Sequence, residues 1–408
     1  MPKINLITGL DIGTGGIKIL VAAKNQDGSD LEVMYQAKEP SFGVRKGVVV
    51  DVEKVSRIIQ VILNKIRTET GFKINSVYTN ISGSHIFATS SRGLVSVSRA
   101  DQRVSEEDVG RVLQAAQTFS MPSNKEIFEV FPKEFIVDGE GGIKEVVGMQ
   151  GVRLETEVLA LGGFSPYKNN LVQAVLDSSL QVLDVIPSPL ASASAVLSQR
   201  QKELGVALLD IGAGTSELAV FEEGNLIHLA VIPIGSGNIT NDIAIGLKTD
   251  IDTAEAIKIE RGCCIFKGND KKEKIETEDE EPLSFSQKNL TKIIAARVSE
   301  IFDEVQKELK KVSKQGMLPS GIVLTGGGAK LPKIVEFAKK ELRLPCRLGR
   351  PAAFSELEDE LSFSTVCGLV LRGVDFGEEV SWRPGKKSLA SRKGIGEKVK
   401  KFFKVFLP

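Results

Sequence analysis

Apolar residues form short β-prone runs in two widely separated parts of the chain, and each run ends in the same tripeptide, Asp-Ile-Gly. These segments are residues 9–21 and 208–220, and in each the tripeptide precedes a turn of small residues and a second β-prone run. Glycine permits a tight turn and lets a ligand approach backbone N–H groups closely. Each segment therefore predicts a β-hairpin with an aspartate, Asp11 or Asp210, beside its tip. The chain as a whole predicts two similar halves.

A third glycine cluster lies at residues 321–332, between another β-prone run and a helical pattern over residues 333–342. Such a turn suits phosphate or nucleoside binding, because its N–H groups are free and a helix N-terminus is electropositive. The remaining periodicity predicts helices at residues 103–119, 169–182, 187–197, 252–261 and 287–312. It predicts strands at residues 126–137, punctuated by Pro132, and 146–161, broken at Gly148 and Gly151, and a charged surface loop at residues 270–282.

The end of the chain has a different pattern. Residues 377–393 are rich in Ser, Gly, Lys and Arg and predict a flexible linker before an amphipathic helix at residues 394–408. At about 100° per residue, one arc of this helix carries Ile395, Val399, Phe402, Phe403 and Phe406. Its opposite side carries Lys400, Lys401 and Lys404, and Lys398 flanks the apolar arc. At about 1.5 Å per residue the helix is about 20 Å long, which suits a position in the headgroup region of an anionic membrane rather than a span. The alternatives are packing on the protein's own core and a calmodulin-like or nucleic-acid partner.

Composition narrows the class of protein. A chain of 408 residues and 44.1 kDa predicts two or more domains, and 42% hydrophobic with 26% charged residues is typical of soluble globular proteins. No apolar run reaches the roughly 18–20 residues of a spanning helix. We expect no secretion signal, and four Cys, two of them adjacent, indicate a reducing cytoplasm. The net charge of zero hides a basic end, where residues 379–408 carry nine Lys or Arg and two Glu. An anionic partner for this end is therefore expected.

The two Asp-Ile-Gly hairpins and the Gly-Gly-Gly turn, in this order, resemble the actin–Hsp70–sugar kinase superfamily. The alternative is three unrelated structural turns. The resemblance implies an α/β fold, the actin-like two-lobed ATPase fold of duplicated ribonuclease-H-like subdomains, with ATP and Mg²⁺ between the lobes. The implied nucleotide-binding residues, called the predicted nucleotide residues below, are Asp11, Gly13, Thr14, Gly15, Gly16, Lys18, Asp210, Gly212, Ala213, Gly214, Thr215, Glu255, Lys258, Gly326, Gly327 and Gly328. Asp11 and Asp210 would hold the Mg²⁺ through water, since a hard cation prefers oxygen ligands.

Individual positions refine this interpretation. Lys18 follows Asp11 at the spacing at which actin-like proteins place a phosphate-contacting lysine, and Ala213 replaces a more usual glycine. Glu255 and Lys258 resemble a ribose-contacting pair, although an exposed i,i+3 ion pair is an alternative. Relatives that cleave ATP place Gln or Glu at the start of the helix near residues 187–192, where this chain has Ser-Pro-Leu. A positioned base is worth about 10²–10⁴-fold in rate, so we assign no catalytic residue and expect at most slow ATP hydrolysis.

The middle and the end of the chain resemble one family within this superfamily, the bacterial cell-division protein FtsA. The resemblance lies in residues 130–138, 142–144 and 147–154, which match the inserted subdomain of that family, and in the basic C-terminal helix. It implies four subdomains, a linker and a membrane-targeting helix. The subdomains are IA (1–83, 164–204 and 363–376), the inserted IC (84–163), IIA (205–234 and 286–362) and IIB (235–285), followed by the linker (377–393) and the membrane-targeting helix (394–408).

The same resemblance implies the partners. An FtsA protein polymerises like actin, binds the C-terminal tail of FtsZ through its second lobe and recruits later division proteins through the inserted subdomain. It binds anionic lipid on the cytoplasmic face of the bacterial plasma membrane at the septum, and no nucleic acid. The implied membrane-binding residues are Ile395, Lys398, Val399, Phe402, Phe403, Lys404 and Phe406. Two alternatives stay open: a PilM-like type IV pilus assembly protein, and a small-molecule kinase of the same superfamily.

Overall fold

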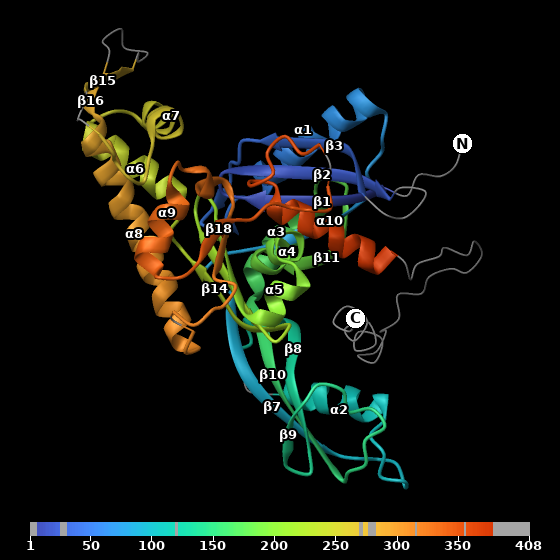
Figure 1. Ribbon diagram of the computed structural model, residues 1–408. Helices are drawn as coiled ribbons and strands as arrows, with labels where there is room; N and C mark the ends of the chain where they lie inside the picture. Colours follow the sequence, from blue (N-terminus) through green and yellow to red (C-terminus); the bar gives the residue numbers. More distant parts are fainter. Residues whose placement is uncertain are drawn as a thin grey trace.

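Two five-stranded sheets of identical topology form the body of the protein, as the computed structural model shows (Figure 1). The structure describes residues 6–24, 31–118, 121–268, 272–275, 283–314, 316–354 and 356–377. In each sheet three antiparallel strands adjoin two strands that run parallel to the first of them. This repeat confirms the actin-like two-lobed fold with duplicated subdomains.

The first sheet defines lobe I. Its strands, in spatial order, are β11 (Gln181–Pro187), β6 (Ser76–Ile81), β1 (Leu6–Gly13), β2 (Gly16–Lys24) and β3 (Leu31–Glu39). A two-stranded hairpin of β4 (Val44–Arg45) and β5 (Val48–Val49) follows β3. Most residues of β1 and β2 are buried, as expected for central strands with helices on both faces.

The helices of lobe I complete its core. They are α1 (Val52–Thr70), α3 (Ser165–Leu176), α4 (Ser188–Val196), α5 (Gln199–Leu204) and α10 (Ser364–Gly377). Helix α1 begins at its cap Asp51, whose side chain accepts a hydrogen bond from the N–H of Lys54, and ends at Gly71 in the left-handed region. Helix α4 contacts β11 of lobe I and also β12 and β13 of the second sheet, so it lies where the lobes join.

The second sheet defines lobe II and repeats the first. Its strands, in spatial order, are β14 (Asn225–Ile232), β13 (Ser216–Glu222), β12 (Val206–Ile211), β17 (Ile322–Thr325) and β18 (Cys346–Leu348). Its other elements are α6 (Ser236–Leu247), α7 (Ile251–Arg261), β15 (Lys272–Ile275), β16 (Leu283–Ser286), α8 (Gln287–Lys311), a 3₁₀ turn η1 (Gly327–Lys330) and α9 (Ile334–Leu342). Apolar side chains of α8 at helical spacing are buried in the core of this lobe.

A separate unit, the insertion, projects from lobe I at the bottom of Figure 1. It consists of α2 (Glu106–Ala116) and a four-stranded sheet with the spatial order β7 (Phe87–Ser96), β10 (Arg153–Phe164), β8 (Lys125–Val137) and β9 (Glu140–Ile143). It has its own hydrophobic cluster. Its strands also contact β14 of lobe II, and the Lys144 ammonium donates to the carbonyl of Glu223 at 2.9 Å.

The structure differs from the sequence expectations in four places. Residues 146–152 form a loop, so only residues from Arg153 onward belong to a strand. Residues 181–182 begin β11 instead of ending a helix, because α3 stops at its cap Asp177. Within the predicted charged loop, residues 272–275 form β15 and pair with β16, and exposed Lys272 and Lys274 alternate with half-buried Glu273 and Ile275. Pro132 does not end its strand, because a bulge in the pairing with β10 accommodates its missing N–H.

Candidate functional site

One cleft of about 710 Å³ lies between the two lobes, within the usual size range of ligand sites. The tips of both Asp-Ile-Gly hairpins, the glycine turn after β17 and helix α7 line it. Every one of the predicted nucleotide residues lies on its wall. The structure therefore brings together all the positions that the sequence pattern selected.

The two hairpin tips meet across the cleft. A Cβ at Gly15 would lie 2.7 Å from the Cβ of Ala213, and a Cβ at Gly214 would lie 2.7 Å from the Thr14 hydroxyl oxygen. Real side chains do not approach so closely, so the approach of the tips requires glycine. The Thr14 hydroxyl also accepts a hydrogen bond from the N–H of Gly47 at 2.8 Å, which joins the first tip to the β4–β5 hairpin.

In lobe I the cleft carries a partly buried ion pair. The Lys18 ammonium lies 2.7 Å from Oδ2 of Asp11, directly opposite it in the β1–β2 register. Burial alone would lower the pKa of Lys18, but the charge of Asp11 and the hydrogen bond to it raise the pKa overall. Lys18 is therefore a permanent cation facing the cleft.

The equivalent register position in lobe II carries an acidic residue instead. Glu217 is paired with Asp210 across β12 and β13, as Lys18 is with Asp11. Both carboxyl groups are buried, and burial raises the pKa of each. The charge of Asp210 raises the pKa of Glu217 further, whereas the Ser192 hydrogen bond and the charge of Lys18 oppose the rise at Asp210. Oε1 of Glu217 accepts from the Ser82 hydroxyl, whereas its buried Oε2 has no hydrogen-bond partner among the residues that the structure describes. Lobe II therefore places a carboxyl group that is largely protonated at neutral pH where lobe I places a cation.

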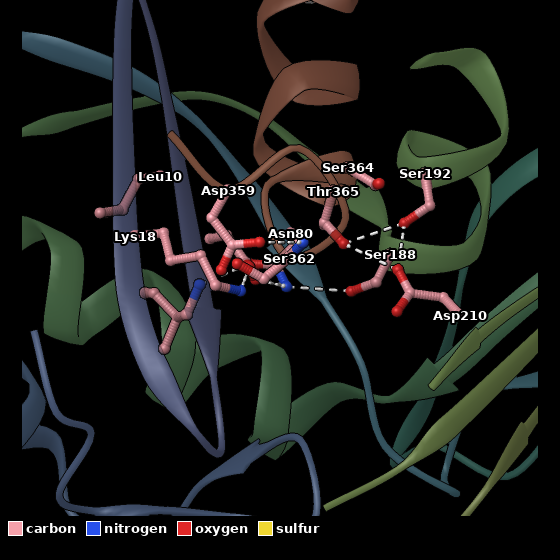
Figure 2. A network of polar contacts seen from close by, with 12 residues as sticks. Leu10, Lys18, Asn80, Ser188, Ser192, Asp210, Asp359, Ser362, Ser364 and Thr365 are labelled. Atoms are coloured by element: carbon pink, nitrogen blue, oxygen red, sulfur yellow. Dashed lines mark hydrogen bonds and ion pairs between the residues drawn. The ribbon is translucent and has the colours of Figure 1, made fainter. Parts of the chain in front are cut away.

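A network of buried hydroxyl and amide groups holds the two aspartates (Figure 2). The Asn80 amide donates to Oδ1 of Asp11 at 2.8 Å and to the hydroxyl of Ser188 at 2.9 Å. The Ser192 hydroxyl donates to Oδ2 of Asp210 at 2.6 Å. The Thr365 hydroxyl lies 3.3 Å from the same oxygen. Each carboxylate therefore has a defined orientation.

Glu255 and Lys258 form an i,i+3 ion pair with 2.6 Å between Oε2 and Nζ. The alternative of an exposed pair is wrong for the lysine, which is buried and also donates to the Thr240 hydroxyl at 2.8 Å. Both residues line the cleft. The turn at Gly326 also lines the cleft. It requires glycine, because its φ is +86° and a Cβ there would lie 2.2 Å from Oδ1 of Asp210.

The sequence pattern did not predict several residues of the site. They are Lys38, Asn80, Ser82, Ser188, Ser192, Glu217, Lys330 and Thr365, of which all but Ser192 line the cleft wall. Only Glu217 had a usable signal, because it follows Asp210 by the same spacing as Lys18 follows Asp11. Asn80 and Thr365 come from distant parts of the chain, and no local pattern marks them.

The acidic half of the cleft fits a hard cation. Asp11, Asp210 and Glu217 are buried beside the partly buried Lys18, and carboxylate oxygens are the donors that Mg²⁺ prefers. In the described ranges no group of three or more His, Cys, Asp or Glu side chains could hold a metal ion by itself. A cation here would therefore need further oxygens, such as those of water and of a polyphosphate.

The predicted membrane-binding residues and the linker after Gly377 lie outside the described residues. No helix in the described part of the chain has the length and apolar character needed to cross a bilayer.

Two lobes of like topology that enclose paired Asp-Ile-Gly hairpins define this molecule as an actin-like protein. Solved structures share the fold at low sequence identity. The PilM–PilN type IV pilus biogenesis complex has a TM-score of 0.66 at 17% identity, over 90% of this chain and 98% of that one. MreB5 of Spiroplasma citri bound to ADP has a TM-score of 0.57 at 14% identity, over 93% and 100%. The MamK double helical filament has a TM-score of 0.51 at 11% identity, over 90% and 98%.

Sequence comparison identifies the family. The profile of the cell division protein FtsA matches residues 207–368, and that of the SHS2 domain inserted in FtsA matches residues 83–161. The cell division protein FtsA of Pseudomonas aeruginosa is 37% identical over 375 residues, which cover 90% of this chain and 89% of that protein. The FtsA of Bacillus subtilis is 36% identical over 354 residues, which cover 86% and 80%. The chain belongs to the FtsA family of cell-division proteins.

Proposed function

We propose that this protein binds ATP and Mg²⁺ in the cleft, polymerises in an actin-like way and tethers FtsZ filaments to the cytoplasmic face of the plasma membrane at the division site. The observation that carries the nucleotide part is the convergence of both hairpin tips, Lys18 and the two held aspartates on one cleft. The ADP bound to the MreB5 relative supports it. We also propose that the subdomains have the boundaries expected from the sequence.

Different residues of the cleft would bind the phosphates, the cation and the ribose. The N–H groups of the glycine tips would donate to phosphate oxygens, as glycine-rich turns do, and Lys18 would supply a fixed positive charge. Asp11 and Asp210 would hold the cation through water, and Glu255 and Lys258 would contact the ribose. A bound Mg²⁺ would supply charge neutralisation of the phosphates. No Gln or Glu stands at the start of α4, so we expect slow hydrolysis at most.

Membrane tethering would come from the basic helix predicted at residues 394–408. A single helix of this kind binds a membrane weakly and reversibly. A polymer presents many such helices, so its effective concentration at the surface rises and the combined attachment becomes strong. The filament of MamK supports polymerisation of this fold, and FtsA family membership supports FtsZ as the partner of lobe II and later division proteins as partners of the insertion.

Nucleotide binding is tested by titrating the purified protein with ATP, with and without Mg²⁺. We expect Lys18→Ala to weaken ATP binding by tenfold or more, because it removes the cation that faces the phosphates. Asp210→Asn should weaken binding by a similar factor in Mg²⁺, because it removes a carboxylate that would hold the cation. The exposed Lys54→Ala serves as the matched control and should bind like the wild type. Equal ATP affinity in all variants would refute the nucleotide site. ADP release at ordinary enzyme rates with an added small-molecule acceptor would instead favour the kinase alternative.

Membrane binding is tested by vesicle flotation with phosphatidylglycerol-containing liposomes. Deleting residues 394–408, or changing Phe402 and Phe406 to Asp, should abolish flotation. Phe42→Asp is the matched control, since Phe42 is an exposed phenylalanine of lobe I outside the tail. Adding FtsZ should bring FtsZ to the vesicles only with the intact tail. Unchanged flotation without the tail would refute the anchor and leave the PilM-like alternative.

A further inference from the structure

Helix α4 carries two serines on one face. Ser188 and Ser192 are four positions apart, so their side chains lie about 6 Å apart along the helix axis and point the same way. Both are buried. Neither helps to cap α4, whose N-cap residue Pro187 makes no side-chain cap hydrogen bond. Their partners lie outside the helix, in the two halves of the cleft.

Ser188 acts on lobe I through an amide. Asn80 is fully used: its oxygen accepts from the N–H of Ile12 at 2.8 Å, and its nitrogen donates to Asp11 and to Ser188. The Ser188 hydroxyl in turn donates to the carbonyl of Ile81 at 3.2 Å. Each donor in this series of hydrogen bonds has a defined partner. The series from α4 to the Asp11 carboxylate therefore has a single arrangement.

Ser192 acts on lobe II directly. Its one proton goes to Oδ2 of Asp210 at 2.6 Å, so Thr365 must be the donor in the 2.9 Å contact between the two hydroxyls. The Thr365 proton is thereby shared between Ser192 and Asp210. Within the described residues, Oδ1 of Asp210 accepts no hydrogen bond, and it lies beside Gly326 on the cleft wall.

We infer that α4 is the element that positions both cation-binding carboxylates, with Ser188 acting through Asn80 on Asp11 and Ser192 acting on Asp210. In Figure 2 dashed lines join Asn80 to Ser188, and Ser192 to Thr365 and to Asp210. The inference rests on the proposed Mg²⁺–nucleotide site. It makes Ser188 and Ser192 positioning residues, which act on the cation by setting how the two aspartates present their oxygens.

The place of α4 in the fold gives this arrangement a consequence. The helix follows the last strand of lobe I and, after α5, leads to the first strand of lobe II. It also packs along α10, whose Thr365 completes the Asp210 contacts. One rigid helix of lobe I therefore contacts the residues that hold both carboxylates, and a rotation of lobe II away from α4 would separate Asp210 from Ser192 while Asp11 kept its bond to Asn80.

Helix α4 also supplies a matched control. Ser194 lies on the same helix, but its hydroxyl donates only to the carbonyl of Ala191 at 2.7 Å and touches neither aspartate. Ser194→Ala therefore removes a hydroxyl from α4 without removing a partner of the cation site. Ser192→Cys is a second probe, because it nearly keeps the shape of serine and replaces a strong donor by a weak one.

The test measures the ATP dissociation constant of the full chain in Mg²⁺ and in EDTA. The quantity compared between variants is the ratio of the constant in EDTA to the constant in Mg²⁺. Loss of an outer partner of a metal ligand typically costs about 10–100-fold in metal affinity. We expect Ser188→Ala, Ser192→Ala and Ser192→Cys to reduce the ratio by about tenfold or more, with the affinity in EDTA within about twofold of wild type. Ser194→Ala should keep the wild-type ratio.

The outcomes separate the inference from the proposed function. A wild-type protein that binds no ATP would refute the proposed function and the inference with it. A wild-type protein with Mg²⁺-dependent binding, and folded Ser192→Ala and Ser192→Cys variants with the same ratio, would refute the inference alone. An equal loss in Ser194→Ala would also overturn it, because the effect would then belong to the stability of α4 and not to the aspartates.

Discussion

His85 stands at the junction between lobe I and the insertion, and its protonation should control the stability of that junction. Its ring packs edge-on against the Tyr167 ring, with 5.0 Å between centroids, and a Cβ at Gly163 would lie 2.9 Å from it. Both ring nitrogens are buried without a hydrogen-bond partner in the described part of the chain. Burial lowers the pKa of His85 from 6.5 to about 4.

The sign of the effect follows from linkage. The unfolded chain takes up a proton on this ring near pH 6.5, whereas the folded protein resists protonation until about pH 4. The neutral ring therefore contributes stability that is complete above pH 6.5 and is lost as the pH falls toward 4. Between pH 8 and pH 5 this shift corresponds to about 2 kcal/mol of the free energy of unfolding, at 1.36 kcal/mol per pKa unit. The ring is only partly buried, so this value is an upper estimate.

The assay compares wild type with His85→Phe, which keeps an aromatic ring and cannot titrate. Urea unfolding between pH 8 and pH 5 gives the free energies, and hydrogen exchange at the amides of residues 83–87 gives the local opening free energy at the junction. His228→Gln is the control, since these are the two histidines of the sequence and His228 pairs with Glu308 instead. The difference between wild type and His85→Phe should change by about 2 kcal/mol across this pH range. A difference that stays constant with pH would refute the reasoning.

Three further changes test other parts of the structure. Asp108→Ala removes the acceptor of hydrogen bonds from Ser98 and Ser105 in the insertion. It should cost about 1–3 kcal/mol and speed hydrogen exchange in α2 while leaving ATP affinity unchanged. Gly368→Ala places a Cβ 1.8 Å from the carbonyl oxygen of Ala191, so it should lower the melting temperature by forcing α10 away from α4. Glu217→Gln removes a buried carboxylate with a raised pKa. The nucleotide-free wild type should lose stability relative to this variant as the pH rises above 4.5, since only the unfolded chain releases the proton there, and parallel pH profiles would contradict it.

The features that the sequence predicted well are local ones. Each Asp-Ile-Gly hairpin is specified within a dozen residues, and α4, α7 and α8 appear where the apolar spacing placed them. The duplicated topology followed from recognising one motif twice. The same duplication points to Glu217, which occupies the position of Lys18 in the second hairpin.

The features that the sequence did not predict depend on contacts between distant segments. Asn80 and Thr365 are ordinary polar residues in their local context, and only folding brings them to Asp11 and Asp210. The loop at residues 146–152 was mistaken for strand because its apolar residues suggested burial, although Val147 is about half exposed. Backbone hydrogen bonds with residues 102–104 hold this loop in place of a sheet ladder.

The insertion joins lobe I through two strands that are hydrogen-bonded neighbours. Phe87, near its beginning, is paired with Gly162, near its end, so the chain leaves lobe I and returns to it at one point. A unit attached in this way can be excised and its ends rejoined by a short turn, or exchanged for the corresponding unit of a relative, without lengthening or shortening the path through the lobe. Chimeras made at this point would transfer whatever the insertion recognises while leaving the cleft in its own scaffold.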